Sequence, residues 1–219
     1  MKIARPGLLY IAVGCGLALC GACISAAGGG RAGSFVTVLG AAFAASCAYF
    51  FRDPDRPLPS DESKIYAPGD GRVLSLEREG ADGIWTLRIF LSLFDVHVQR
   101  FPCSGTVSKV ERRKGSFAMA MRPEASSNER VVIGILPDGR TEQIVVEQIT
   151  GFIARRIECR TRAGGRAVAG ERYGLIHFGS QVALRLPESV RLLVNPGDRV
   201  VGGITVIGEW TNGEEAFPS

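Results

Sequence analysis

Two long uncharged stretches open the chain, and short runs that mix apolar and polar residues follow them. Residues 7–27 form a run of 21 positions without a charge. At about 1.5 Å per residue, such a run is long enough to cross a hydrocarbon core of roughly 30 Å. A second uncharged run covers the 17 residues 35–51, after a break at residues 28–31. The pattern predicts a two-helix membrane hairpin at the N-terminus.

Most of the nearby positive charges lie outside this predicted hairpin. Lys2 and Arg5 precede the first run and Arg52 and Arg56 follow the second, whereas the connection holds Arg31 alone. Because loops rich in lysine and arginine favour the cytoplasmic side, we expect both ends of the hairpin in the cytoplasm. The domain that follows would then lie on the cytoplasmic face of the cell (inner) membrane. A cleaved signal peptide is the alternative, but it leaves the second apolar run unexplained.

A domain boundary is predicted directly after the second apolar run. Residues 52–59 contain three prolines, which exclude a helix there and indicate a stiff linker. The sequence therefore divides into a membrane anchor at 1–51, a linker at 52–62 and a β-rich domain at 63–219.

The β-rich domain consists of short runs with β-branched and aromatic residues, separated by turn signals such as residues 137–140. Two Pro-Gly-Asp turns, at residues 68–70 and 196–198, are similar to those of lipoyl and biotinyl domains. We therefore expect a mainly β fold of the β-sandwich or hybrid-barrel type. The predicted strands are 72–76, 84–93, 105–111, 130–136, 142–149, 153–159, 181–186, 190–194 and 203–207.

Composition narrows the possible functions. The net charge is +4, and residues 1–51 carry +3 of it, so the remaining 168 residues are close to neutral. A nucleic-acid-binding protein needs a concentrated basic face and is therefore not expected. The chain has only two histidines, which excludes a zinc site of three imidazoles, and no metal site is predicted. Four of the six cysteines lie in the apolar runs, and the other two indicate no disulfide framework.

Six short segments occur in an order that is specific as a set. In that order they resemble the bacterial phosphatidylserine decarboxylases in their short form. The resemblance extends from about Phe51 to Glu209. The segments are FRDP at 51–54, APGDG at 67–71, FLSLFDVHV at 90–98, PCSG at 102–105, NER at 128–130 and FGS at 178–180.

The resemblance implies a chain that cuts its own backbone between Gly179 and Ser180. Ser180 Oγ would attack the Gly179 carbonyl, because a glycine without Cβ lets the backbone bend into the turn required. Elimination and hydrolysis would then convert residue 180 into a pyruvoyl group, a covalent cofactor made from the chain itself. Its ketone would form a Schiff base with the serine head group and accept the electrons left when carbon dioxide departs. The product would be phosphatidylethanolamine.

Further site residues follow from the same resemblance. His97 is the candidate acid that returns a proton, because imidazole titrates near neutral pH. Asp70 matches the acidic residue of the self-processing site, although a Gly-Asp-Gly turn explains it equally well. Asn128 and Arg130 could hold the substrate head group, but a strand-end cap or a salt bridge would account for them too.

One departure from the family concerns the base for self-processing. Well-known members carry a second histidine three positions after the first, where this chain has Arg100. Arginine stays protonated and cannot act as a base. Either His97 performs both tasks, or Asp70 or His177 contributes. A structural role for His177 is the more common outcome for such a residue.

The expected partners are phosphatidylserine in the bilayer and the two cleaved chains, 1–179 and 180–219, as a heterodimer. A homodimer is a further alternative. Two other functions compete with this one. The first is a pyruvoyl decarboxylase of a soluble amino acid, against which the apolar helices argue. The second is a noncatalytic membrane-tethered β-sandwich that binds a partner and is never cut.

Overall fold

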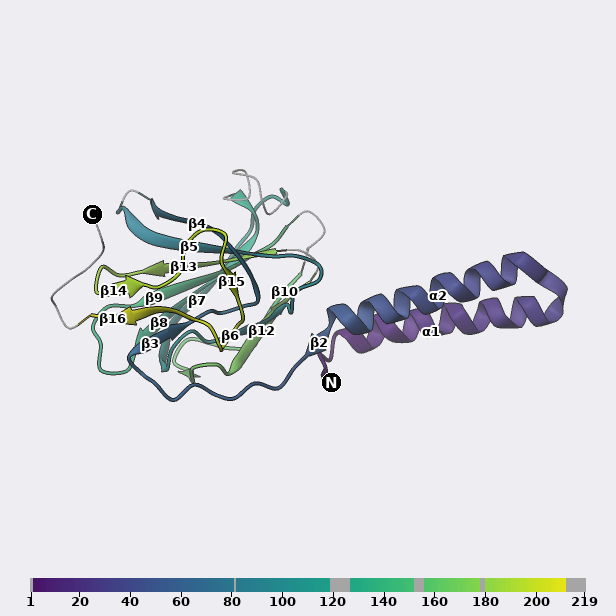
Figure 1. Ribbon diagram of the computed structural model, residues 1–219, viewed down its shortest axis with the longest axis horizontal. Coiled ribbons are helices and arrows are strands. Elements are labelled where there is room, and N and C mark those ends of the chain that lie inside the picture. Colours follow the sequence, from purple (N-terminus) through teal and green to yellow (C-terminus); the bar gives the residue numbers. More distant parts are fainter. Residues whose placement is uncertain (1, 81, 119–126, 152–155, 178–179, 212–219) are drawn as a thin grey trace. The chain divides into compact units, whose positions relative to one another are not determined.

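The chain forms two units, which are described in turn. The computed structural model describes residues 2–80, 82–118, 127–151, 156–177 and 180–211. The first unit is Met1–Asp55 and the second is Arg56–Ser219. Figure 1 labels their elements.

The first unit is a helical hairpin. Helix α1 (Gly7–Ile24) leads through a short π-helical turn (Ser25–Gly29) into α2 (Gly30–Phe50), and the two helices run antiparallel (Figure 1). The chain reverses at Gly28 and Gly30, whose φ angles of 92° and 47° lie in the region that favours glycine. The segment Gly7–Phe50 is long and apolar enough to cross a membrane. Helix α2 begins at Gly30, five residues before the second uncharged run, because the charged residue Arg31 is accommodated within its first turn.

Small residues at intervals of seven allow the two helices to pack closely. A Cβ added at Gly14 would lie 2.7 Å from the backbone nitrogen of Ala44, and one added at Gly21 would lie 2.7 Å from Thr37 Oγ1. Such residues let helix backbones approach each other in membranes. At the open end of the hairpin, where both termini of this unit lie, β1 (Lys2–Ile3) pairs with β2 (Arg52–Asp53). The buried positions that line the contact are Gly7, Gly14 and Gly21 of α1 and Gly33, Gly40 and Cys47 of α2.

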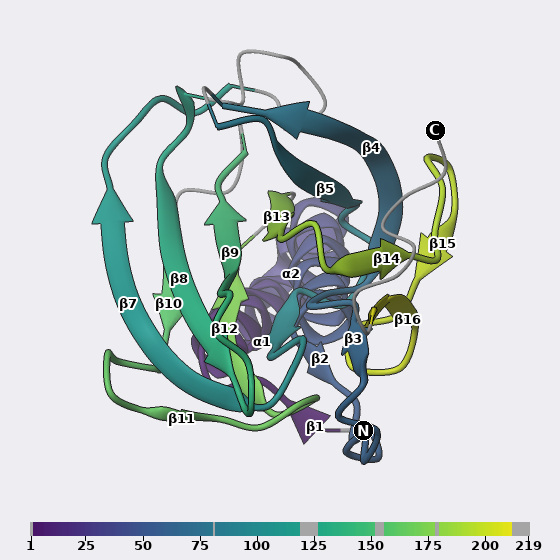
Figure 2. The same ribbon diagram turned by 90° about the vertical axis from the view of Figure 1, so that its left-hand side faces the viewer.

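The second unit is built on an antiparallel sheet of eight strands in the order β11-β7-β8-β9-β13-β5-β4-β15. Figure 2 shows that the sheet curls from β7 round to β4. The expected mainly β fold is confirmed, and its large sheet is curled into a half-barrel. The strands are β4 (Gly71–Glu79), β5 (Ile84–Leu91), β7 (Gly105–Arg113), β8 (Arg130–Pro137), β9 (Ile144–Ile149), β11 (Arg166–Ala167), β13 (Ser180–Leu186) and β15 (Arg199–Val200).

Two three-stranded sheets complete this unit. One has the order β10-β12-β6 and the other the order β14-β16-β3. The first consists of β10 (Ile157–Cys159), β12 (Arg172–Ile176) and β6 (Val98–Arg100), and the second of β14 (Val190–Leu192), β16 (Val206–Trp210) and β3 (Lys64–Tyr66).

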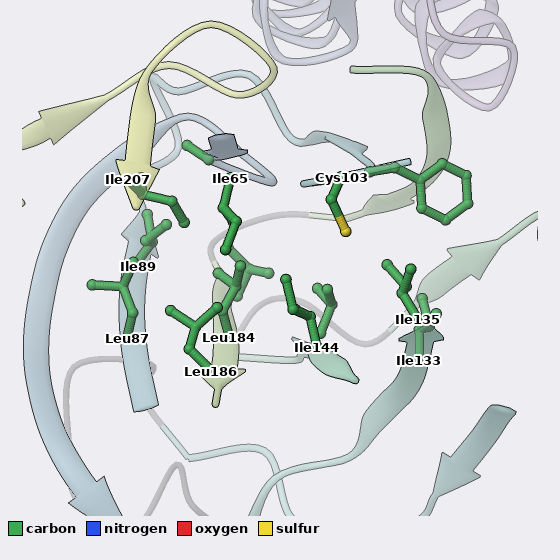
Figure 3. Packing of buried hydrophobic residues seen from close by; sticks show 14 of the residues in the cluster. Ile65, Leu87, Ile89, Cys103, Ile133, Ile135, Ile144, Leu184, Leu186 and Ile207 are labelled. Carbon is green, nitrogen blue, oxygen red and sulfur yellow. The ribbon is translucent and has the colours of Figure 1, made fainter. Parts of the chain in front are cut away.

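The hydrophobic core lies inside the curled sheet. On β8 the alternate residues Val131, Ile133 and Ile135 belong to it, as expected for a strand with one face turned inward. Figure 3 shows Ile65 and Ile207 from the β14-β16-β3 sheet among the side chains of β5, β8, β9 and β13. The small sheet therefore closes part of the core.

Most predicted strands are confirmed, with boundary shifts that have local causes. The strand expected at 203–207 instead begins at Val206, because Gly203 has a φ of 71° and starts a turn. Of the strand expected at 153–159, residues 153–155 lie outside the described part of the chain, and β10 begins at Ile157. Strands β3, β6 and β12 were not predicted, and β6 and β12 contribute to the candidate site.

Candidate active site

Ser180 is the first residue of β13, a strand in the middle of the large sheet. It pairs with Leu91 of β5, while its neighbour Gln181 pairs with Ile149 of β9. Ser180 shares a face with Val182, which belongs to the core. Its side chain is fully buried, and Oγ has no hydrogen-bond partner among the described residues. A buried hydroxyl without a partner is costly, so the position is unusual for a residue with only a structural role.

His97 is linked to the neighbourhood of Ser180 in two ways, along the chain and through a backbone hydrogen bond. Along the chain it follows β5, which ends at Leu91, the residue paired with Ser180. Across the small sheet its carbonyl oxygen accepts a hydrogen bond of 3.3 Å from the backbone nitrogen of Ile176, four residues before Ser180. The ring is fully buried.

The tautomer of His97 follows from its hydrogen bond. Nδ1 lies 3.0 Å from the carbonyl oxygen of Asp95, and a carbonyl can only accept. Nδ1 therefore carries the hydrogen, and in the neutral ring Nε2 presents a lone pair. Such a ring is oriented to accept a proton and to return it.

A buried glutamine faces the same interior space. Gln148 of β9 pairs with Val182, so its side chain lies on the same face of the sheet as Ser180. It is fully buried, and neither amide atom has a hydrogen-bond partner among the residues described. A Cβ added at Gly174 of β12 would lie 2.8 Å from Nε2 of Gln148. The absence of a side chain at position 174 thus makes room for this amide.

Gln99 of β6 is a second buried amide, and it lies on the same side of β12 as Gln148. It pairs with Gly174, and residues paired across a ladder share a face. Its Nε2 donates a hydrogen bond of 3.3 Å to the carbonyl oxygen of His97, while Oε1 has no partner within the described structure. His97, Gln99, Gln148 and Ser180 are buried polar side chains that lie on or next to strands paired with one another, and together they define the polar region.

Asp70 is held by a network of its own. Its carboxylate accepts two hydrogen bonds from Arg56, of 2.7 and 2.8 Å, and a third of 2.8 Å from the backbone nitrogen of Gly202. Arg56 also donates to the carbonyl oxygen of Gly202. The network connects the Pro-Gly-Asp turn at 68–70 with the turn that follows β15 and with the start of the domain, and it favours the structural interpretation of Asp70.

Arg100 occupies the position of the family's second histidine. It is almost fully buried, and its guanidinium donates a hydrogen bond of 2.8 Å to the carbonyl oxygen of Gly170. Its side chain lies beside Gly203, where an added Cβ would be 2.9 Å from Cδ. Because successive residues of a strand face opposite sides, Arg100 points away from the side that Gln99 faces.

His177 also lies outside the polar region. Its Nε2 is 3.5 Å from Glu158 Oε1, and Glu158 pairs with Leu175 on β12. The ring therefore lies on the Leu175 face, opposite Gly174. Burial lowers the pKa of His177, and the Glu158 carboxylate opposes part of this shift. This environment favours a structural role.

Comparison with known proteins identifies the family. A sequence model described as phosphatidylserine decarboxylase matches residues 43–208. The chain belongs to the phosphatidylserine decarboxylase family. This match includes Asp70, His97, Gln148 and Ser180.

Several relatives from this family can be aligned with the chain over most of their length. Each of the following is named a phosphatidylserine decarboxylase proenzyme. The relative from Saccharopolyspora erythraea is 45% identical over 181 residues, which cover 78% of this chain and 76% of the relative. The relative from Granulibacter bethesdensis is 43% identical over 187 residues, covering 81% and 76%. The relative from Solibacter usitatus is 40% identical over 208 residues, covering 94% and 96%.

The side-chain amide of Asn128 makes all of its hydrogen bonds within the protein. Its Oδ1 accepts from the backbone nitrogen of Ala118 at 2.7 Å and from Ser116 Oγ at 3.0 Å. Its Nδ2 donates to the carbonyl oxygens of Ala118 and Thr150 at 2.9 and 2.8 Å. An amide can make about four hydrogen bonds, so no capacity is left for a substrate head group in this conformation.

Arg130 is also engaged within the protein. Its guanidinium donates 2.9 Å to Glu147 Oε2 and 3.1 Å to the carbonyl oxygen of Asn128. Both members of the Arg130–Glu147 pair are largely buried. The salt-bridge interpretation is therefore favoured over a role in head-group binding.

Gly179, the other half of the predicted cleavage bond, lies outside the described residues. Gln148 was not among the candidates from the sequence. One signal could have found it, because a glutamine stands where the alternation of Ile144 and Val146 requires an inward-facing apolar residue.

Proposed function

We propose that this chain is a membrane-tethered enzyme that cuts itself between Gly179 and Ser180 and then decarboxylates phosphatidylserine to phosphatidylethanolamine. Family membership supports the reaction. The observation that carries the proposal is the Ser180 hydroxyl, which is fully buried, faces inward at the start of a central strand and lacks a hydrogen-bond partner among the described residues.

The first step is an attack of Ser180 Oγ on the carbonyl carbon of Gly179. The new C–O bond replaces the amide C–N bond, the hydroxyl proton leaves and the nitrogen of residue 180 gains a proton. Nε2 of His97 accepts the hydroxyl proton, because Nδ1 donates to the carbonyl oxygen of Asp95 and Nε2 is then the unprotonated nitrogen of the neutral ring. Loss of the Cα proton of residue 180 then breaks the Cβ–O bond, and Gly179 departs as a carboxylate. Water replaces ammonia at the resulting dehydroalanine and leaves a ketone.

Gln148 stabilises the negative charge that develops in the first step. Attack on the carbonyl places a negative charge on the Gly179 oxygen, and a preorganised N–H donor lowers the energy of that state. Gln148 shares the face of Ser180 and has an unused amide donor. Because glutamine is neutral, this donor does not depend on pH.

The buried polar region also suits the group that would form at position 180. A pyruvoyl group held there would supply a carbonyl that can take up the substrate's amine and withdraw electrons as carbon dioxide leaves. His97 then returns a proton to the substrate carbon. Since Ser180, His97 and Gln148 are inaccessible to solvent in the uncut chain, substrate entry requires the segments around them to move. Cleavage makes that movement possible.

After cleavage the fragment 180–219 stays bound to the fragment 1–179. Its strand β13 lies between β9 and β5 of the larger fragment. The hairpin of α1 and α2 tethers the enzyme to the inner membrane, with the domain on the cytoplasmic side. That orientation follows from the positions of Lys2, Arg5, Arg52 and Arg56.

Denaturing electrophoresis of the purified protein tests the proposal. The wild-type chain should give two fragments, and Ser180→Ala should stay whole. Ser189→Ala is a matched control, because Ser189 is a half-buried serine of the same fragment that bonds Glu142 and lies nine residues from the cleavage bond; this variant should be cut as the wild type is. A whole wild-type chain would favour the noncatalytic binding module. Cleavage with activity on free serine would favour a decarboxylase of soluble amino acids.

A further inference from the structure

The turn between β5 and β6 displays two large apolar side chains. Leu93 is 42% exposed and Phe94 is 74% exposed. Phe94 is the most exposed of the large hydrophobic residues described in the second unit. Adjacent exposed apolar residues of this size commonly mark a surface that contacts a partner or a membrane.

This turn is held in one conformation by a dense set of hydrogen bonds. The carboxylate of Asp95 accepts from the backbone nitrogen and Oγ of Ser92, at 2.9 and 2.7 Å, and from Arg199 at 2.7 Å. The backbone nitrogen of Asp95 donates 3.0 Å to the carbonyl oxygen of Ser92. The display of Leu93 and Phe94 is therefore preorganised, so binding through them loses little conformational entropy.

Both ends of the turn lead to the candidate active site. On one side is Leu91, which pairs with Ser180, and on the other is His97. Two exposed arginines flank the turn, since Arg199 pairs with Arg72 on the neighbouring strand. Arginines near apolar side chains suit the boundary between acyl chains and lipid phosphates.

We propose that Leu93 and Phe94 insert into the bilayer interface and bring the adjoining active site to the level of the lipid head groups. The proposal rests on the proposed function, in which the substrate is a lipid of the same bilayer. The occupant of this surface is the membrane itself, because the hairpin already keeps the chain at the bilayer and the substrate amine lies at its surface.

A fluorescence experiment tests insertion without requiring catalysis. Phe94→Trp is made in the uncut Ser180→Ala protein and reconstituted into vesicles with brominated acyl chains, which quench nearby indoles. The two native tryptophans give the background. The matched control is Leu136→Trp, at an apolar position that is 41% exposed. Arg130 lies at the Ser180 end of the sheet, and position 136 is about 20 Å from it along β8.

Insertion predicts strong extra quenching for Phe94→Trp and none for Leu136→Trp. Equal quenching in the two variants, or none in either, would overturn the proposal. This result does not depend on whether the wild-type chain cuts itself, so failure of the proposed function would be recognised separately.

Kinetics on two forms of substrate give a second test. In Phe94→Ser the KM for phosphatidylserine in vesicles, as a mole fraction, should rise about tenfold, the effect expected for losing burial of one such side chain. Self-cleavage and the rate on dispersed short-chain phosphatidylserine should stay unchanged. An equal loss on vesicles and on short-chain substrate would assign Phe94 a structural role and contradict insertion.

Discussion

Replacing Gln148 by leucine should stabilise the protein while slowing its self-cleavage. The side chain is fully buried and its amide has no partner among the described residues. A buried polar group without a hydrogen bond costs about 1–3 kcal/mol. Leucine has a similar size and no polar atom, so the free energy of unfolding should rise by about 1–3 kcal/mol.

The same change removes the donor proposed for the Gly179 oxygen. Loss of one such donor slows acyl transfer by about 100-fold to 1000-fold in well-studied enzymes. We therefore expect the half-time of self-cleavage to lengthen by at least about 100-fold. Gln148→Met should be similarly slow, because methionine keeps the length of the side chain but has no N–H donor.

Two assays on full-length protein in detergent measure these effects. Cleavage is followed on denaturing gels after synthesis, and thermal unfolding is recorded in the uncut Ser180→Ala background. A gain of 1 kcal/mol should raise the Tm by about 2–4 °C for a chain of this size. Gln143→Leu is the matched control, because Gln143 lies exposed just before the same strand and should affect neither measurement. Wild-type cleavage of Gln148→Leu, or a lowered Tm, would refute the reasoning.

Three further predictions concern stability and reactivity. Glu147→Ala should lower the free energy of unfolding by about 3–5 kcal/mol in a urea titration, because it breaks a largely buried ion pair by removing the carboxylate that Arg130 contacts; a loss below about 1 kcal/mol would contradict this. Burial lowers the pKa of His177, so the unfolded chain binds its proton first as the pH falls below about 6.5. Stability should therefore decrease from pH 7 to pH 5, and His177→Gln should reduce this decrease; an identical pH profile in both proteins would contradict it. Burial also raises the pKa of the Cys103 thiol to about 12. Iodoacetamide at pH 8 should leave Cys103 unlabelled until urea is added, as read by peptide mass spectrometry, and labelling of the folded protein would show that the thiol is accessible.

The periodic parts of the fold were predictable from the sequence. Strands such as β4 and β7 begin with an alternation of buried and exposed positions, and the apolar runs correspond to helices. Strands β3 and β6 have only three residues each, too few for an alternation to be recognised. β6 also carries the buried polar residues Gln99 and Arg100, which tertiary contacts stabilise in place of apolar burial.

The candidate site was only partly predictable. The order of the segments indicated Ser180 and His97, and the strand arrangement explains how they come to one region. The interactions of Asp70 could not be foreseen, because Gly202 lies 132 positions further along the chain and Arg56 comes from the expected linker. Gln148 faces Ser180 only through the register of β9 with β13, and register depends on the folded sheet.

Mass spectrometry of the small fragment tests the central claim most directly. The account predicts a fragment of residues 180–219 that is lighter than its encoded sequence by one ammonia, with a pyruvoyl group at its first position. The same fragment should lose its N-terminal ketone signal when it is treated with a hydride donor. An active enzyme with an uncut chain, or a fragment that begins with an ordinary serine, would contradict the account.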